Sequence, residues 1–164
     1  MNDELPRSGA LRDGVHLYPV RVYYEDTDAA RLVYYANYLK FAERARTEFL
    51  RVLGFGQEKL RDTTGIGFVV RHCAADFRGS ARLDDDLIVA THVTGIGAAT
   101  LDMVQDIRRG DLILVSLVFR IACLGPDGRP IRLPTELRTA FQHFPPAGAS
   151  RESRSGTAGA NFQG

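Results

Sequence analysis

Two aspartates, Asp26 and Asp28, end a strand-like run and stand shortly before the start of an amphipathic helix. A carboxylate can deprotonate a water molecule or attack a carbonyl carbon directly. The first amides of a helix have no partner inside the helix and carry a partial positive charge, so they can hold a developing oxyanion. A carboxylate beside such amides has the parts needed to cut an activated acyl bond, such as a thioester.

Asp28 has two interpretations at this stage. A free aspartate has a pKa of about 3.9 and is ionised near pH 7, as a general base or a nucleophile must be. An aspartate in a loop is also a common Asx-turn or helix-capping residue, and loop statistics alone favour that structural role. Asp26 is expected to be structural, with its carboxylate bound to nearby amides or to Arg31.

The elements that would position these groups follow from hydrophobic spacing. Residues 20–24 alternate between apolar and polar, as a half-buried strand does. From residue 36 to residue 53 an apolar residue recurs every three or four positions, which predicts one long helix. Gly54 stands where a left-handed residue ends a helix, and Phe55 is expected to fold back on the last turn.

Four longer strand-like runs follow, at residues 66–77, 87–94, 100–108 and 112–124. The connections 95–98 and 109–111 are short, so the strands that they join are expected to be antiparallel neighbours. The last run is nearly all apolar, which indicates a strand that is covered on both faces or lies at an interface. Pro134 can open a final short helix through residue 144.

One long helix and about five strands predict an α+β fold, in which an antiparallel sheet wraps around a central helix. Residues 17–144 are expected to form this domain, after a flexible leader at residues 1–16. Residues 145–164 are rich in Pro, Ala, Gly and Ser and are expected to be a disordered tail. The fold would leave an apolar outer strand, which a second copy of the chain would cover.

Composition narrows the class of protein. A chain of 164 residues suits one domain. Its net charge of +1 argues against a nucleic-acid partner. No run approaches the ~18 apolar residues of a membrane span, and the first residues do not resemble a secretory signal. Cys73 and Cys123 lie in apolar runs and are interpreted as buried free thiols. We therefore expect a cytoplasmic protein.

Three stretches carry a resemblance to a known family: VRVYYEDTD at 20–28, VY and ANY at 33–38, and FAERARTE at 41–48. They closely resemble the hotdog-fold thioesterases of the 4-hydroxybenzoyl-CoA type. ARLDD at 81–85 is similar to the branch of Tol–Pal-associated acyl-CoA thioesterases of Gram-negative bacteria. The likeness covers roughly residues 18–143.

This resemblance implies a hotdog homodimer, commonly paired again into a homotetramer, with the acyl-CoA site at the dimer interface. It implies that Asp28 is the catalytic carboxylate and that Tyr24 is an associated tyrosine. It also implies that the backbone amide of Tyr35 polarises the thioester carbonyl. No metal or redox cofactor is expected, because CoA is part of the substrate.

The remaining candidates are residues that would bind the substrate around this centre. They are Arg31, Tyr34, Ala36, Asn37, Arg78 and Arg82. Among them the arginines are suited to the phosphates of CoA. The four histidines are too scattered in the sequence to suggest a metal site.

The chain departs from the family pattern at two places. The branch often has Gly-Gly after Asp-x-Asp-Ala, where this chain has Ala30-Arg31. It often has His where this chain has Tyr35. Arg31 adds bulk and charge that could narrow the acyl pocket, contact a phosphate or point to solvent. Tyr35 removes an imidazole but keeps the main-chain amide.

Two functions from different classes remain open. The first is an acyl-CoA thioesterase that releases a free carboxylic acid and CoA. The second is a non-catalytic hotdog protein that binds acyl-CoA or acyl carrier protein, or engages an envelope-associated partner. The sequence leaves open the length of the acyl chain and the choice between CoA and a carrier protein. It also leaves open whether Asp28 acts as nucleophile or general base.

Overall fold

The computed structural model describes residues 5–144, which form one antiparallel sheet and three α-helices. In chain order the elements are β1 (Ala10–Arg12), β2 (Val15–Arg21), the 3₁₀ helix η1 (Tyr24–Asp26), α1 (Asn37–Val52), α2 (Gln57–Thr64), β3 (Gly67–Phe77), β4 (Asp86–Ile96), β5 (Thr100–Arg109), β6 (Leu112–Leu124) and α3 (Thr135–Gln142).

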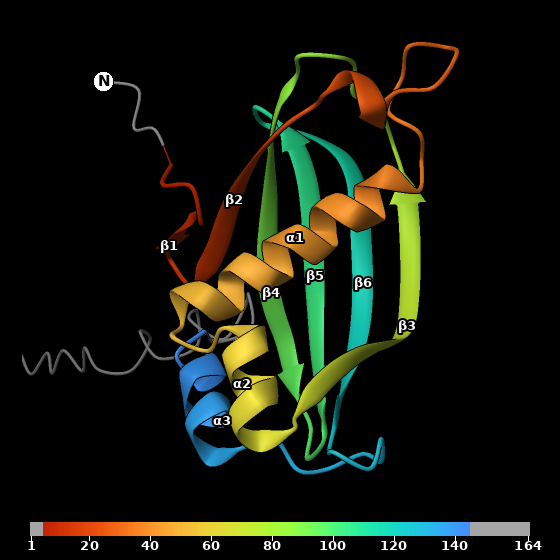
Figure 1. The fold of residues 1–164 in the computed structure, drawn as a ribbon. Coiled ribbons are helices and arrows are strands. Elements are labelled where there is room, and N and C mark those ends of the chain that lie inside the picture. Colours follow the sequence, from red (N-terminus) through yellow and green to blue (C-terminus); the bar gives the residue numbers. More distant parts are fainter. Residues whose placement is uncertain (1–4, 145–164) are drawn as a thin grey trace, which may run out of the picture.

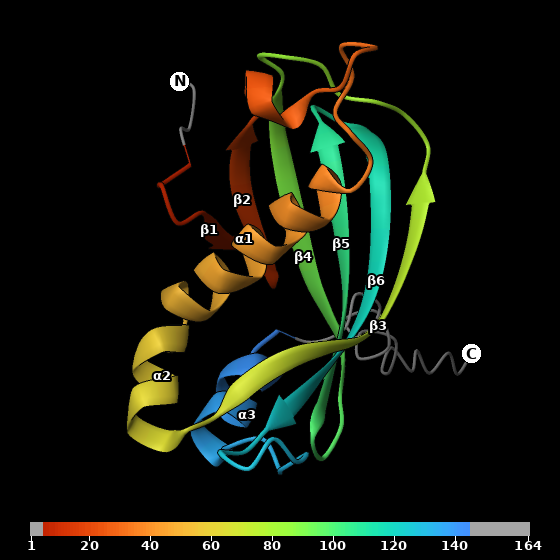
Figure 2. The same cartoon turned by 45° about the vertical axis from the view of Figure 1, so that its right-hand side comes forward.

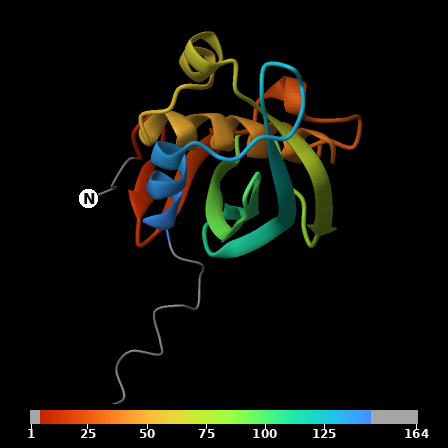
Figure 3. The same cartoon turned by 90° about the horizontal axis from the view of Figure 1, so that it is seen from below.

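The sheet has six strands in the order β1-β2-β4-β5-β6-β3. Helix α1 runs diagonally across one face of the sheet (Figure 1). Seen from below, the sheet curves around this helix (Figure 3). The predicted α+β hotdog arrangement is confirmed, with one strand more than the expected five.

Helix α1 forms where its apolar stripe was predicted. The stripe is buried against the sheet through Tyr38, Ala42, Ala45 and Phe49. At its end the amide of Phe55 donates to the carbonyl of Leu50 at 2.8 Å, and the amide of Gly54 donates to that of Arg51 at 3.0 Å. Gly54 has a φ of 89°, so the predicted left-handed helix end is confirmed as a Schellman motif.

The apolar run of β6 lies inside the sheet, between β5 and β3. Its inward side chains Val115, Leu117 and Phe119 are buried. The expectation that an apolar strand forms the outer edge is therefore corrected, because β3 occupies that edge. Strand β3 is exposed from Val69 to Phe77, and α1 begins beside its end, where the rings of Tyr38 and Phe77 lie 6.2 Å apart (Figure 1).

Two elements were missed by the sequence analysis. Helix α2 contains a single bulky apolar residue, Leu60, and therefore resembles a polar link. The hairpin of β1 and β2 begins within the expected leader, residues 1–16, so that expectation is wrong from residue 10 onward. Its turn is Asp13-Gly14 with φ values of 49° and 77°, a hairpin signal that could have been recognised.

His16 shows how firmly this hairpin belongs to the fold. The side chain has no exposed surface, and its ring stacks on Phe49 with centroids 5.1 Å apart. Its Nε2 lies 2.9 Å from the carbonyl oxygen of Ser8. Burial lowers the pKa of His16, against the opposing effects of the Ser8 carbonyl and of Glu48.

We expect acid to destabilise the protein through His16. A histidine whose pKa is lowered by folding binds its proton more readily when unfolded, so stability is lost as the pH falls below about 6.5. Urea unfolding at about pH 7.5 and about pH 5.5 should show this fall, with a smaller fall in His16→Gln. An equal loss in both proteins would contradict the assignment to His16.

Candidate functional site

The predicted site residues lie at one end of the sheet, where α1 begins, β3 ends and η1 turns the chain (Figure 2). Strand β2 ends at Arg21, so the expectation of a strand through Tyr24 is wrong. The reason is a local turn, in which the carboxylate of Asp26 accepts the amide of Tyr23 at 2.8 Å. The structural role expected of Asp26 is thereby confirmed.

Asp28 has the geometry of an Asx turn. Its Oδ1 accepts the amides of Ala30 at 2.8 Å and of Leu32 at 3.3 Å. The backbone closes the same loop, with the amide of Arg31 donating to the carbonyl of Asp28 at 2.9 Å. The other carboxylate oxygen, Oδ2, accepts no hydrogen bond from the described residues. The structural interpretation of Asp28 is therefore confirmed for Oδ1, which anchors the side chain, and Oδ2 stays available to a ligand.

An open hollow of about 590 Å³ brings three predicted residues together. Asp28, Tyr24 and Arg31 line it, beside Thr27, Ala29 and Leu83. Tyr24 belongs to η1 and is 82% exposed, so ordinary sheet packing is excluded for its ring. Its phenol and the carboxylate of Asp28 thus face the same solvent-filled space.

The start of α1 offers free donors. The amide of Tyr34 donates to the carbonyl of Asp26 at 2.9 Å, and the amide of Asn37 donates to the carbonyl of Tyr34 at 2.8 Å. Between them, the amides of Tyr35 and Ala36 donate to none of the residues from 5 to 144. The amide predicted to polarise the thioester carbonyl, that of Tyr35, is one of these two free donors. Both lie at the positive end of the helix dipole.

The aromatic side chains around these amides form an exposed cluster. Tyr35 is 60% exposed, and its ring lies 4.8 Å from that of Tyr34 and 6.1 Å edge-on from that of Phe77. Asn37, by contrast, is buried, and its side-chain amide donates to the carbonyl of Asp26 at 2.9 Å. Asn37 therefore contacts the loop before the helix and does not face the hollow.

The three predicted arginines differ in whether their guanidinium groups have a partner. Arg78 pairs through its Nε with Asp76 at 2.7 Å on the exposed end of β3. The guanidinium groups of Arg31 and Arg82 donate to no group among the described residues. The backbone of Arg82 pairs with Leu32 in an isolated bridge, so Arg82 stands beside the loop of Asp28.

Arg31 has an unusual backbone conformation, with a φ of 61°. A side chain in this left-handed region costs roughly 1–2 kcal/mol, and glycine adopts it without that cost. The family branch often has glycine at this position. The arginine is therefore held here against local backbone preference, and it lines the same hollow as Asp28.

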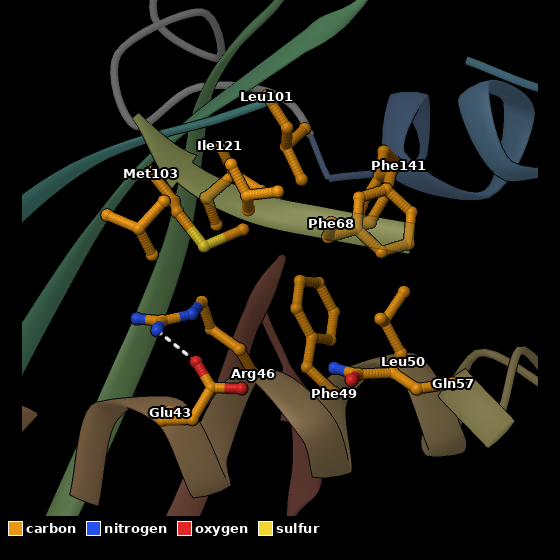
Figure 4. A pocket seen from close by; sticks show the side chains of 12 residues that line it. Glu43, Arg46, Phe49, Leu50, Gln57, Phe68, Leu101, Met103, Ile121 and Phe141 are labelled. Atoms are coloured by element: carbon orange, nitrogen blue, oxygen red, sulfur yellow. Dashed lines mark hydrogen bonds and ion pairs between the residues drawn. The ribbon is translucent and has the colours of Figure 1, made fainter. Parts of the chain in front are cut away.

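A second cavity, of about 60 Å³, lies between the later turns of α1 and the sheet (Figure 4). Its walls are mostly apolar, and Arg46 and Glu43 form an ion pair at one side. The guanidinium of Arg46 also lies 4.2 Å from the ring centre of Phe119 and bonds to Gln105 at 2.8 Å. This cavity shares no lining residue with the hollow at Asp28.

The cysteines differ from one another. Cys123 is buried as expected, but Cys73 is exposed because it lies on the uncovered strand β3, which corrects the expectation for this thiol. Among the described residues, no group of three or more His, Cys, Asp or Glu side chains could hold a metal ion. Nor is any described helix long and apolar enough to cross a membrane.

Comparison with known proteins gives consistent relatives. The model of the Thioesterase-like superfamily matches residues 22–141. Acyl-CoA thioesterase YbgC of Haemophilus influenzae is 44% identical over 135 residues, which are 82% of this chain and 99% of that protein. Acyl-CoA thioester hydrolase YbgC of Escherichia coli O6:H1 is 39% identical over 127 residues, 76% of this chain and 94% of that protein. A probable thioesterase from Bartonella henselae has a crystal structure with a TM-score of 0.71 and 38% identity, covering 73% of this chain and 99% of that one.

The backbone strain at Arg31 can be measured. Arg31→Gly and Arg31→Ala both remove the guanidinium, but only glycine removes the cost of the left-handed conformation. We expect the glycine variant to be more stable than the alanine variant by about 1 kcal/mol in urea unfolding. Equal stability of the two variants would show that residue 31 is not left-handed in solution.

Proposed function

Because this chain belongs to the thioesterase-like superfamily, we propose that it hydrolyses acyl-CoA thioesters, with Asp28 as the reacting carboxylate and the amide of Tyr35 as oxyanion donor. The observation that carries this proposal is a carboxylate oxygen and two amides, all without partners among residues 5–144, on one loop that the bond from Tyr34 to Asp26 closes. The names of the YbgC relatives support CoA as the thiol.

In the proposed reaction the thioester carbonyl oxygen points toward the amides of Tyr35 and Ala36. Asp28 removes a proton from water as its oxygen attacks the carbonyl carbon, or Asp28 attacks that carbon itself and forms a mixed anhydride that water then opens. The amides hold the negative oxygen of the tetrahedral intermediate, a contribution worth about 10²–10³ in rate per donor. Collapse breaks the carbon–sulfur bond, and the leaving thiolate of CoA takes up a proton.

The arginines beside Asp28 are assigned to the anionic part of CoA. Arg31 and Arg82 have unpaired guanidinium groups, which suits charge-assisted bonds to phosphate. Tyr34 and Tyr24 would contact the pantetheine arm or the acyl group. Arg78 would first have to exchange its partner Asp76, and an ion pair as exposed as this one is weak.

The setting of the reaction completes the proposal. The chemistry uses a carboxylate, water and amides, so no metal or redox cofactor is invoked. Acyl-CoA is made inside cells, which favours a cytoplasmic enzyme. The stretches at 20–28 and 81–85 favour the Tol–Pal-associated branch. Either CoA or the phosphopantetheine of an acyl carrier protein would present the same thioester.

Strand β3 supports assembly through its free edge. An edge strand presents unpaired backbone groups that pair readily with a second strand. The side chains of Cys73, Ala75 and Phe77 on its inner face are exposed. Phe77 touches Tyr35, so a copy that pairs along β3 would lie next to the helix start. We propose a homodimer formed through β3, with two such dimers forming the homotetramer.

Asp28→Asn tests the carboxylate. Asparagine keeps an oxygen that can accept the amide of Ala30 but cannot take a proton from water, so we expect kcat to fall by roughly 10²–10⁴ with unfolding unchanged. The measurement is thiol release over a panel of acyl-CoAs, with Asp62→Asn on exposed α2 as control. Hydrolysis close to wild type by Asp28→Asn would falsify the assignment. Tight acyl-CoA binding by the wild type without thiol release would instead support the binding protein.

Ala75→Lys tests the edge. A long charged side chain on the inner face of β3 should weaken pairing between copies, so light scattering is expected to show a dimer or larger species for the wild type and a lower mass for the variant. Val52→Lys, at the exposed end of α1, serves as the matched control. An unchanged mass for Ala75→Lys would contradict assembly through β3.

A further inference from the structure

Asn37 uses its side chain to join two segments and not to cap its helix. It is the first residue of α1, it is 7% exposed, and its Nδ2 donates to the carbonyl oxygen of Asp26 at 2.9 Å. A capping side chain would accept an amide of the first turn. Here the amide group is a donor, and its acceptor lies on η1.

The carbonyl oxygen of Asp26 also accepts the amide of Tyr34 at 2.9 Å, while the amide of Asn37 donates to the carbonyl of Tyr34 at 2.8 Å. These three hydrogen bonds form a closed link, which we name the Asp26 clamp. Asp28 follows Asp26 by two residues. The two unpaired amides, those of Tyr35 and Ala36, lie in the sequence between Tyr34 and Asn37, the other two residues of the clamp. The clamp thus fixes the position of the proposed carboxylate relative to the proposed oxyanion donors.

Tyr38, the next residue, uses its side chain to link α1 to the segment before β4. It is 2% exposed, and its hydroxyl oxygen accepts the amide of Ala81 at 2.9 Å. The carbonyl of Ala81 in turn accepts the amide of Val33 at 2.9 Å, and the backbone of Arg82 pairs with Leu32. Burial raises the pKa of Tyr38, partly offset by the bond from Ala81, so the phenol stays neutral at working pH.

We propose that Asn37 and Tyr38 are positioning residues with separate effects on catalysis: Asn37 sets the distance between carboxylate and oxyanion donors, and Tyr38 sets the place of the segment that carries Arg82. This inference rests on the proposed thioesterase activity. Loss of the first link displaces reacting groups, and a displacement of about 1 Å can cost about 10² in rate. Loss of the second link displaces a residue that binds the anionic part of CoA, while the Asp26 clamp still holds the reacting groups.

The test compares three variants with the wild type on one acyl-CoA. Asn37→Ala and Asn37→Asp both remove the donor to Asp26, and only the second adds charge. We expect both to lower kcat by about 10- to 100-fold with KM changed less than about threefold. Tyr38→Phe removes only the hydroxyl, and we expect KM to rise about 5- to 20-fold with kcat changed less than about threefold, as for the loss of one hydrogen bond.

Binding of CoA itself, measured by calorimetry, separates affinity from rate. Tyr38→Phe should weaken CoA binding about as much as it raises KM, and Asn37→Ala should leave CoA binding unchanged. The acid limb of the pH–rate profile should be the same for Asn37→Ala and the wild type. Such a result would mean that the substitution moves the carboxylate without changing the pH at which activity is lost. Thermal unfolding checks that every variant compared is folded at the assay temperature.

The outcomes are distinguishable from those of the thioesterase proposal. A wild type that releases no thiol from any acyl-CoA overturns the proposed function and this inference with it. A wild type that hydrolyses, with Asn37 variants equal to it in kcat, overturns the positioning role alone. Parallel changes in kcat and KM for Asn37 and Tyr38 variants would mean that both residues only support the fold, which also overturns the inference.

Discussion

A single carbonyl oxygen, that of Asp26, joins the two parts of the site. It accepts the amide of Tyr34 and the side chain of Asn37, both at 2.9 Å. These bonds close the single loop of residues 27–36, which carries both Asp28 and the amides of Tyr35 and Ala36. Without them that loop would be less ordered, and each ordered residue costs about 1–2 kcal/mol of conformational entropy. The bonds are made by Asp26, Tyr34 and Asn37, so neither Asp28 nor the amides of Tyr35 and Ala36 has to supply them.

The clamp can hold only if α1 itself is fixed on the sheet. That attachment is partly polar. Gln105 of β5 has no exposed surface, and its Nε2 donates to the carbonyl of Ala42 and to the hydroxyl of Thr91, both at 3.0 Å. Its Oε1 accepts the guanidinium of Arg46 at 2.8 Å. A buried polar network with its partners satisfied allows one arrangement of helix against sheet, whereas an apolar contact alone tolerates sliding.

The loop that carries Asp28 contains a strained backbone position. Arg31 adopts a left-handed conformation in which glycine would be unstrained. The aromatic rings of Tyr24, Tyr34 and Tyr35 remain largely exposed at this end. Strain and exposed apolar surface gathered at one place are typical of functional sites, where neighbouring elements hold residues that would otherwise relax. The exposed strand β3 ends at the same place and extends this exposed surface.

Local patterns in the sequence determined the long helix, the four long strands and the left-handed end at Gly54, because spacing between near neighbours dictates them. The motif around Asp28 was also readable, including the structural use of Asp26. Tertiary structure alone decided that β3 and not β6 forms the edge, that Cys73 is exposed, and that Asn37 reaches back to Asp26. The first two depend on which distant strands pair, and the third depends on how the loop between η1 and α1 closes. A one-dimensional hydrophobic period carries no information about either.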